Sequence, residues 1–292
     1  MTRVRREALS NAGALDERWD RSDGEQRGVA FAELRDLIRP IAPPAIIWRT
    51  AFCCPDRLAS CLDAPGASLV LKRPMALVDL NAARRSGVEA ADDRLAAAVL
   101  SCLGRRFDPN ERVIVVAGDT SALLPDAAAI GAPMLMLYSS CRELIALVAA
   151  GGEDRRGLVR RLMAERVLAS GPSLRWRPED LYALSDLQVA AIFWHCQVAE
   201  FRAITRAVGP GQARALDMAD VLAAPGLALA RLDQFFGLGL DRARILAASA
   251  KFGPRSETPS DPSIDALVEW SYRVCPETPR VDPIGSPLSA EV

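Results

Sequence analysis

Four short runs of almost uninterrupted apolar residues constrain the fold of this chain more than any other feature. They are AIIW at 45–48, SLVLK at 68–72, RVIVV at 112–116 and MLMLY at 134–138. Runs of this length without polar alternation are typical of parallel strands that are buried on both faces. Segments with helical apolar spacing lie between them, so the chain is predicted to form a three-layer α/β fold, with a fifth strand at 214–218.

The second half of the chain is predicted to be mostly helical. Its expected helices cover 141–150, 154–168, 185–208, 220–224, 226–236, 241–250 and 264–272. Ser185 followed by Gln188 forms a capping-box pattern at the start of the longest one. We expect one α/β domain at 28–274, between a flexible N-terminal arm at 1–27 with one short helix and a flexible tail at 275–292.

Composition argues against several functional classes. The chain has 292 residues and a formal net charge of −1, which provides no overall field to attract nucleic acid or an anionic membrane. The charged N-terminus and the lack of a long apolar run predict a cytoplasmic protein. Seven cysteines without a CxxC pair and a single histidine fit neither a disulfide framework nor a zinc site, so no metal is expected.

The stretch from Ala45 to Asp63 has the order strand, loop, helix. In α/β proteins such a loop lies at the carboxyl end of a strand and directs the first free N–H groups of the helix at the ligand, which is often a phosphate. The loop here contains Phe52-Cys53-Cys54-Pro55-Asp56. This order makes the loop the first candidate for a binding site.

Five segments occur in the order found in one protein family. They are AFCCPDRLASCLDAPG, LVLKRPMALVDL, RVIVVAGDTSALLPD, MLMLYSSCRELI and ALDMADVLAAPGLALARLDQFFGL. Together they cover roughly 45–252 and resemble the bacterial sulfotransferase family, which has a fold like that of P-loop NTPases and uses 3′-phosphoadenylyl sulfate. The resemblance implies that the cofactor's 5′-phosphosulfate would lie at Cys53, Cys54 and Leu58.

The loop departs from the family pattern at two positions. Pro55 and Asp56 stand where serine and threonine are expected, so one backbone donor is lost and a negative charge is added beside the ligand. At about 4 Å and an effective dielectric constant of about 20, a like charge costs several kcal/mol. If the cofactor still binds, Arg57, Arg73 and Lys251 are the cations expected to take over its phosphate contacts.

Two other loops depart in the same way. Ala117-Gly118-Asp119-Thr120 replaces a Lys-Pro-Thr type sequence, and Tyr138-Ser139-Ser140 replaces the Arg-x-Pro that contacts the 3′-phosphate in the family. A basic helix at 154–168 presents either a solvated face or one that contacts an anion.

Several single residues allow two interpretations. Asp119 is a candidate base towards an acceptor hydroxyl, or it caps the next helix. His195 is a second candidate base, or it is packed in the core. The pair Cys53-Cys54 could supply a thiolate nucleophile, which would require His195 within hydrogen-bond reach.

Two functional hypotheses follow. The first is a sulfotransferase that transfers a sulfuryl group from 3′-phosphoadenylyl sulfate to a small-molecule acceptor, with activity that its degraded cofactor motifs could impair. The second is a pseudo-enzyme that keeps the scaffold to bind a partner protein or another small molecule. The motif segments alone do not identify the acceptor or the partner.

Overall fold

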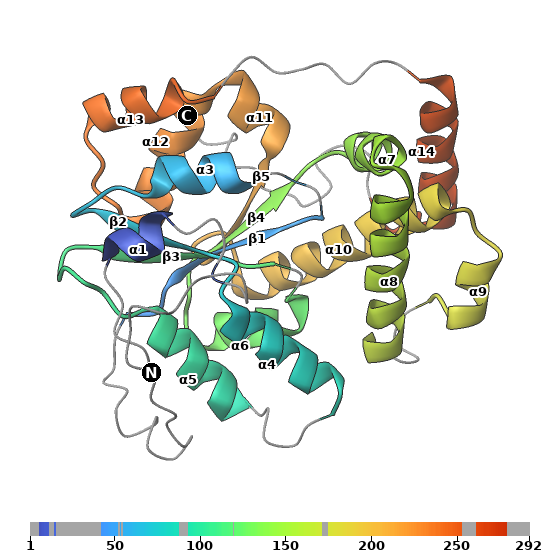
Figure 1. Ribbon diagram of the computed structural model, residues 1–292, viewed down its shortest axis with the longest axis horizontal. Helices are drawn as coiled ribbons and strands as arrows, with labels where there is room; N and C mark the ends of the chain where they lie inside the picture. The colour runs from blue at the N-terminus through green and yellow to red at the C-terminus, as the bar shows by residue number, and fades with distance from the viewer. Residues whose placement is uncertain are drawn as a thin grey trace.

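A computed structural model of the chain describes residues 6–11, 15, 42–51, 53, 55–87, 93–118, 120–170, 175–252 and 261–278. Its centre is a five-stranded parallel sheet with the order β2-β3-β1-β4-β5 (Figure 1). The strands are β1 (Ala45–Arg49), β2 (Ser68–Lys72), β3 (Arg112–Val116), β4 (Met134–Tyr138) and β5 (Ala213–Asp217). All five predicted strands are confirmed, and their observed ends lie within one residue of the prediction.

Both faces of the sheet are covered by helices, which confirms the three-layer arrangement. One face carries α3 (Pro55–Leu62), α11 (Met218–Ala223), α12 (Pro225–Phe236) and α13 (Arg242–Ser249). The other face and its flank carry α4 (Met75–Arg85), α5 (Asp93–Leu103), η1 (Ser121–Leu123), α6 (Leu124–Ala129), α7 (Cys141–Ala150), α8 (Gly152–Ser170), α9 (Pro178–Tyr182), α10 (Asp186–Val208) and α14 (Pro262–Val274). Figure 1 shows the two layers above and below the sheet.

Alternation along β1 explains why two separate cores form. Ile46 and Trp48 pack into the core on the α10 side, whereas Ala45 and Ile47 pack into the core under α3. Successive side chains of a strand point to opposite faces, so a strand covered on both sides must be apolar at every position. This is the pattern from which the sequence predicted a parallel sheet.

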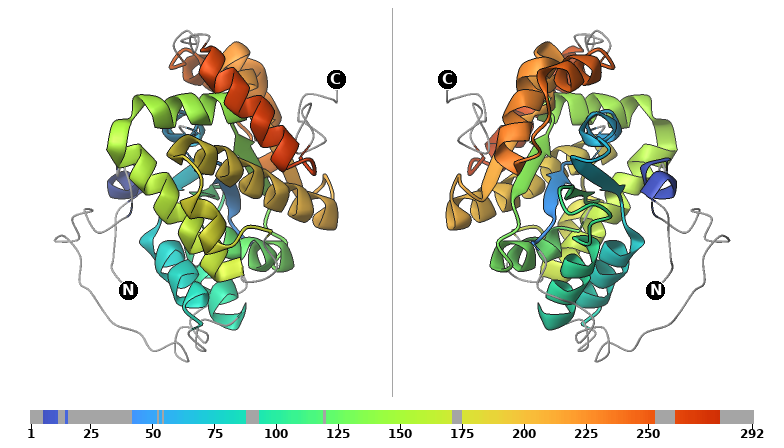
Figure 2. Two further views of the ribbon diagram at one scale, coloured as in Figure 1. Left: turned by 90° about the vertical axis from the view of Figure 1, so that its right-hand side faces the viewer. Right: turned by 90° about the vertical axis from the view of Figure 1, so that its left-hand side faces the viewer.

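The long helix α10 passes through the larger core. Its start is fixed by a capping box in which Ser185 accepts from the N–H of Gln188, as predicted. It contacts α7, α8 and α14, and Figure 2 shows α14 lying across it. These helices and the sheet enclose α10, so the residues in its middle are buried on every side.

The N-terminal helix α1 (Arg6–Asn11) lies against β2. Arg6 pairs with Asp63 and Glu111, and the backbone of Leu15 bonds to Lys72 and Met75 at the open edge of β2. These contacts fasten α1 to the domain, where the sequence predicted an arm with one short helix. The domain boundaries themselves remain predictions. Apolar residues at helical spacing also predict a short helix at 31–38, and that segment lies outside the described residues.

No helix in the described part of the chain is long and apolar enough to cross a membrane. Among the described residues there is also no group of three or more His, Cys, Asp and Glu side chains placed to hold a metal ion.

Candidate functional site at the carboxyl edge of the sheet

The strand order defines where a ligand would bind. From β1 the chain leaves on the α3 face, whereas from its two neighbours β3 and β4 it leaves on the opposite face. Ligands of open α/β sheets bind beyond the carboxyl ends of strands where the connections diverge in this way. The candidate site therefore lies at the loop after β1, between the loops that begin at Ala117 and Ser139.

Hydrogen bonds within the loop after β1 hold it in place. The Thr50 N–H donates to Leu137 O at 3.0 Å, and the Thr50 hydroxyl accepts from the Ser139 N–H at 3.3 Å. The Cys53 N–H donates back to Thr50 O at 3.3 Å. Thr50 is completely buried. The loop is thus joined to the end of β4 and folded on itself.

Helix α10 contacts both loops from the other face of the sheet. The Ala51 N–H donates to Gln197 Oε1 at 3.1 Å, and Trp194 Nε1 donates to Ser139 O at 2.7 Å. Gln197 and Trp194 are both buried. Backbone groups that could face a ligand are therefore engaged by α10.

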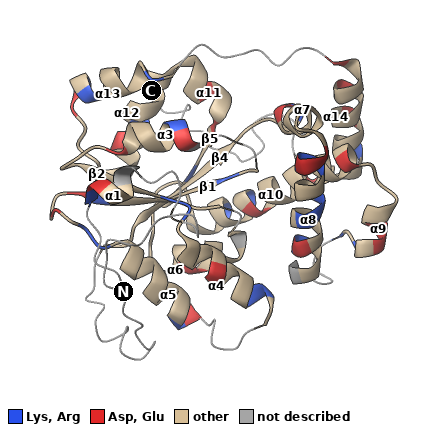
Figure 3. Cartoon of the chain, viewed as in Figure 1, with Lys and Arg blue, Asp and Glu red and all other residues tan. Residues whose placement is uncertain are grey.

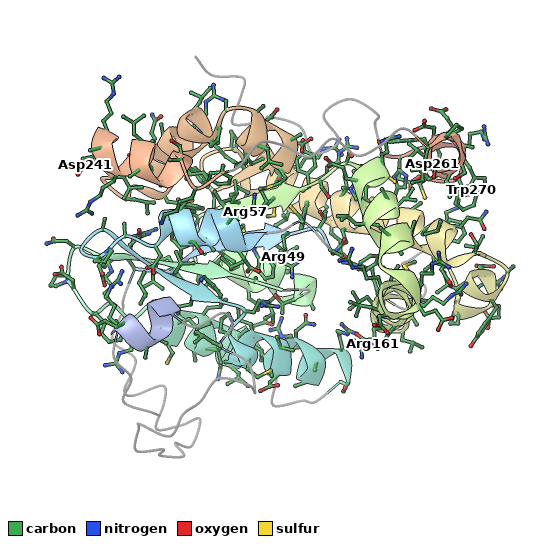
Figure 4. The ribbon with its side chains drawn as sticks, turned by 45° about the horizontal axis from the view of Figure 1, so that its top comes forward. Arg49, Arg57, Arg161, Asp241, Asp261 and Trp270 are labelled. Carbon is green, nitrogen blue, oxygen red and sulfur yellow. The ribbon has the colours of Figure 1, made fainter. Side chains whose placement is uncertain are left out.

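Four cations lie at the carboxyl edge of β1 and β2 or in the first turn of α3. Arg49 ends β1 and Lys72 ends β2, and by alternation both project on the α3 face, like Ile47 and Val70. Arg73 follows Lys72 with a left-handed φ of 48°. Arg57 is exposed on α3, and Figure 4 labels Arg49 and Arg57 at the two ends of the loop after β1.

The negative charge of Asp56 opposes the attraction of these cations for an anionic ligand. It lies exposed in the first turn of α3, where a carboxylate interacts favourably with the helix dipole. It therefore uses the positive end of α3 that an anionic ligand would otherwise use. Water screens part of its repulsion of a ligand, so the charge of Asp56 weakens binding less than the sequence alone suggests.

Two residues predicted at the cofactor loop, Cys53 and Leu58, have buried side chains. Cys53 is buried, and Leu58 is fully enclosed in the core under α3. Leu58 can therefore contribute only backbone atoms to a site, while its side chain holds α3 on the sheet. Cys54 lies outside the described residues.

Lys251 lies at the other end of α3. Its Nζ donates to Ser60 O at 3.5 Å, in the last turn of the helix. Burial raises the pKa of the neighbouring Cys61 thiol, and the charge of Lys251 offsets part of that rise. A cation in the last helical turn is stabilised by the dipole. This position gives no support for Lys251 as a phosphate ligand.

His195 is packed among aromatic rings and does not face the loop. Its Nε2 lies 3.0 Å from Ser271 Oγ, and edge-on rings of Trp194 and Tyr272 have centroids at 5.0 Å and 4.9 Å. Ser271 Oγ donates to Val268 O at 2.7 Å, so the histidine nitrogen is the donor to it. Burial lowers the pKa of His195 to about 4, so the ring is neutral at pH 7.

Asp119 lies outside the described residues, and its role stays a prediction. Its neighbour Thr120 is buried, and Thr120 Oγ1 has no hydrogen-bond partner among the described residues. Ser139 Oγ, at the end of β4, is likewise buried without a partner in that part of the chain. Two buried hydroxyls on either side of β1 thus make no hydrogen bond to the described residues.

Two residues at this edge were not predicted from the sequence. Arg49 could have been found, because it is the first polar residue after the apolar run of β1 and must project at the carboxyl end. Gln197 could not, because it lies 146 positions from Ala51 and nothing local marks its partner. The predicted residues that the structure brings to the same end of the sheet are Cys53, Arg57 and Arg73.

A phosphosulfate group makes specific demands on a binding loop. Such a group needs several N–H donors arranged around three or more anionic oxygens. Among the described amides, those of Ala51 and Cys53 are engaged and Pro55 has none, which leaves the first-turn amides of Asp56 and Arg57. Within the described part of the loop, two free amides are too few donors to fit the group.

No protein-family model and no curated protein sequence matches this chain. Two solved sulfotransferase structures are similar to it. One is the sulfotransferase domain from the curacin biosynthetic pathway, at 9% identity and a TM-score of 0.49, covering 80% of this chain and 98% of that one. The other is a sulfotransferase from Alicyclobacillus acidocaldarius, at 13% identity and a TM-score of 0.43, covering 80% and 95%.

Proposed function

We propose that this protein is a sulfotransferase-like scaffold with an impaired 3′-phosphoadenylyl sulfate site, which acts without sulfuryl transfer by binding a partner protein or another small molecule. The observation that carries the proposal is the hydrogen bond from the Ala51 N–H to Gln197 Oε1. It engages a backbone amide of the loop after β1, two positions before Cys53, where the resemblance places the start of the phosphosulfate site. Pro55 and Asp56 weaken the same site independently.

A second candidate is an active sulfotransferase that binds its cofactor through side chains. It is favoured by four cations, Arg49, Lys72 and Arg73 at the carboxyl edge of β1 and β2 and Arg57 in the first turn of α3. Guanidinium groups bind phosphate bidentately and could replace backbone donors. The charge of Asp56 and the engaged amides count against this candidate.

A thermal-shift titration with 3′-phosphoadenosine 5′-phosphate separates the two candidates. A ligand at 100 times its dissociation constant stabilises a protein by about 2.7 kcal/mol, which is roughly 5 °C or more in Tm for a domain of this size. The scaffold proposal predicts an unchanged Tm up to millimolar nucleotide. A saturable rise would instead support cofactor binding through the cations.

A further inference from the structure

Helices α12 and α13 expose an apolar surface in the layer that covers the α3 face of the sheet. Leu227 on α12 and Leu246 on α13 are 50% and 59% exposed, although both are large hydrophobic side chains. Apolar residues gathered on one surface of a soluble protein mark an interaction site, whereas single exposed ones do not. The exposed residues that make up this α12–α13 face are Leu227, Ala230, Ala243, Leu246, Ala247 and Ala250.

The exposed stripes of the two helices lie side by side. A Cβ added to Gly226, at the start of α12, would lie 3.9 Å from the Cβ of Ser249 at the end of α13. The connection 237–241 joins the other two ends, so the helices run antiparallel. Helical residues three or four apart share one side of a helix, which places the members on each helix in one stripe. Figure 1 shows α12 and α13 adjacent to each other above α3.

The two ends of the α12–α13 face carry opposite charge. Asp220 is exposed on α11, just before α12 begins, and Arg242 is exposed at the start of α13. The carboxylate of Asp241 caps α13 by accepting from the Arg244 N–H at 2.7 Å, so two arginines outnumber one aspartate there. Lys251 reaches a carbonyl of α3 and not this face. Figure 4 labels Asp241 at the left-hand end of the layer, and Figure 1 shows α11 towards the other end.

We propose that the α12–α13 face binds a second copy of this chain, in a two-fold dimer that places Asp220 of each copy beside Arg242 of the other. A two-fold axis through the middle of the face reverses it end for end, so each charged end meets the opposite charge while leucines and alanines meet at the centre. A face of this kind is complementary to itself. The alanines let the helices of the two copies approach closely, and a net charge of −1 gives little repulsion between them.

Sedimentation velocity of the natural protein should show a concentration-dependent equilibrium between monomer and dimer. Leu246→Glu puts a carboxylate at the centre of the contact twice in each dimer, and it should weaken association at least about 100-fold because that charge is buried without a partner. The matched control is Leu168→Glu, since Leu168 is 74% exposed on α8, which packs against the other core. Both positions are exposed, so both variants should keep the Tm of the natural monomer.

Charge reversal at low ionic strength tests the two-fold arrangement. Asp220→Lys and Arg242→Glu each bring like charges together at two contacts, so each variant alone should dimerise roughly tenfold more weakly. In an equimolar mixture, the lysine of one variant faces the glutamate of the other, and the remaining natural pair is kept. Heterodimers should therefore form about as tightly as natural dimers.

The outcomes separate this inference from the proposed function, which is tested by nucleotide binding and goes untouched by the state of association. A natural protein that stays monomeric up to submillimolar concentration overturns the inference. A dimer that Leu246→Glu does not weaken uses another surface, which also overturns it. The two-fold pairing is wrong if a mixture of Asp220→Lys and Arg242→Glu associates no better than either variant alone.

Discussion

Arg6 is a single residue that attaches the N-terminal helix to the sheet. Its guanidinium donates to Glu111 Oε1 at 2.5 Å, to Ser68 O at 2.7 Å and to Asp63 Oδ1 at 3.2 Å. Glu111 is almost fully buried and also accepts from the Gly66 N–H. Removing Arg6 would therefore leave a buried carboxylate without its cation, which is far more costly than losing a surface ion pair.

We expect Arg6→Met to destabilise the protein by about 3 kcal/mol. Chemical denaturation measures this directly, and Tm should fall by roughly 6 °C or more. The matched control is Arg177→Met, because the Arg177–Asp180 pair is 75% exposed on the arginine side and should contribute little. Equal effects of the two substitutions would contradict the importance assigned to Glu111.

At the level of residues, sequence reasoning succeeded where chemistry is local. Pro55 and Asp56 could be recognised as poor phosphate ligands because the lost donor and the added charge follow from the residue types alone. Arg166 belongs to the basic helix predicted at 154–168 to present a solvated face or one that contacts an anion, but it is buried, pairs with Glu200 and lies over the ring of Phe193. Its partners lie on α10, so no pattern within its own helix could reveal them.

Among the elements, α3 illustrates how both ends of a short helix can be stabilised by charge. Asp56 lies in its first turn and Lys251 reaches a carbonyl in its last turn. Each charge has the sign that the helix dipole favours. In this arrangement Lys251 contacts the carboxyl end of α3, and its predicted phosphate contact stays a prediction.

Lys251→Met should lower stability by about 0.5 kcal/mol at low salt, and the difference should disappear at high salt because the interaction is exposed. Denaturant titrations at two ionic strengths measure both effects. Arg57→Met is the comparison, since that cation lies in the first turn of the same helix and its loss should not destabilise α3. A larger loss for Arg57→Met than for Lys251→Met would contradict this assignment.

Elements were predictable to different degrees. The five strands were found because complete burial leaves no polar position, and α7 was predicted with its observed bounds, Cys141–Ala150. The short helix α9 was missed, because five residues give no apolar period. Figure 3 shows acidic and basic residues mixed along α8, so its charge pattern gave no direction for its packing.

For the whole molecule, the junction of α7, α10 and α14 determines how the helical half is held together. His195 on α10 donates to Ser271 on α14, and Cys141 Sγ on α7 lies 3.9 Å from the same hydroxyl. The adjacent Trp194 bonds to the loop after β4. Docking of α14 is thus linked through α10 to the carboxyl edge of the sheet.

Lowering the pH should reduce the stability of the fold through protonation of His195. Its pKa is about 4 in the folded state and 6.5 in the reference state, so between these values the unfolded chain binds the extra proton. Stability therefore falls as pH drops from about 6.5 to about 4, by up to about 3 kcal/mol, and the loss levels off below that.

His195→Leu should remove this pH dependence. The measurement is the free energy of unfolding of both proteins across pH 4 to 7, because shifts shared by other groups, such as the raised pKa of the buried Asp126, cancel in the difference. If the difference in the free energy of unfolding between the two proteins stayed constant across this pH range, that result would contradict a neutral, buried His195.

The tertiary arrangement lay beyond sequence reasoning, and it matters most for function. A parallel sheet was predictable, but its strand order and the contact between α10 and the loop after β1 depend on residues far apart in the chain. The contact from α10 engages the Ala51 amide in a loop whose order, strand then loop then helix, is typical of phosphate binding. Arg161, labelled on α8 in Figure 4, shows that cations also occur on helices outside this loop.

Calorimetric titration of the natural protein with 3′-phosphoadenylyl sulfate tests the central claim most directly. An impaired site predicts no saturable heat of binding up to millimolar cofactor and no release of 3′-phosphoadenosine 5′-phosphate on incubation. Saturable binding at micromolar concentration, with weaker binding on substitution of Arg49 or Arg57, would show instead that the cations hold the cofactor and that the protein is a working sulfotransferase.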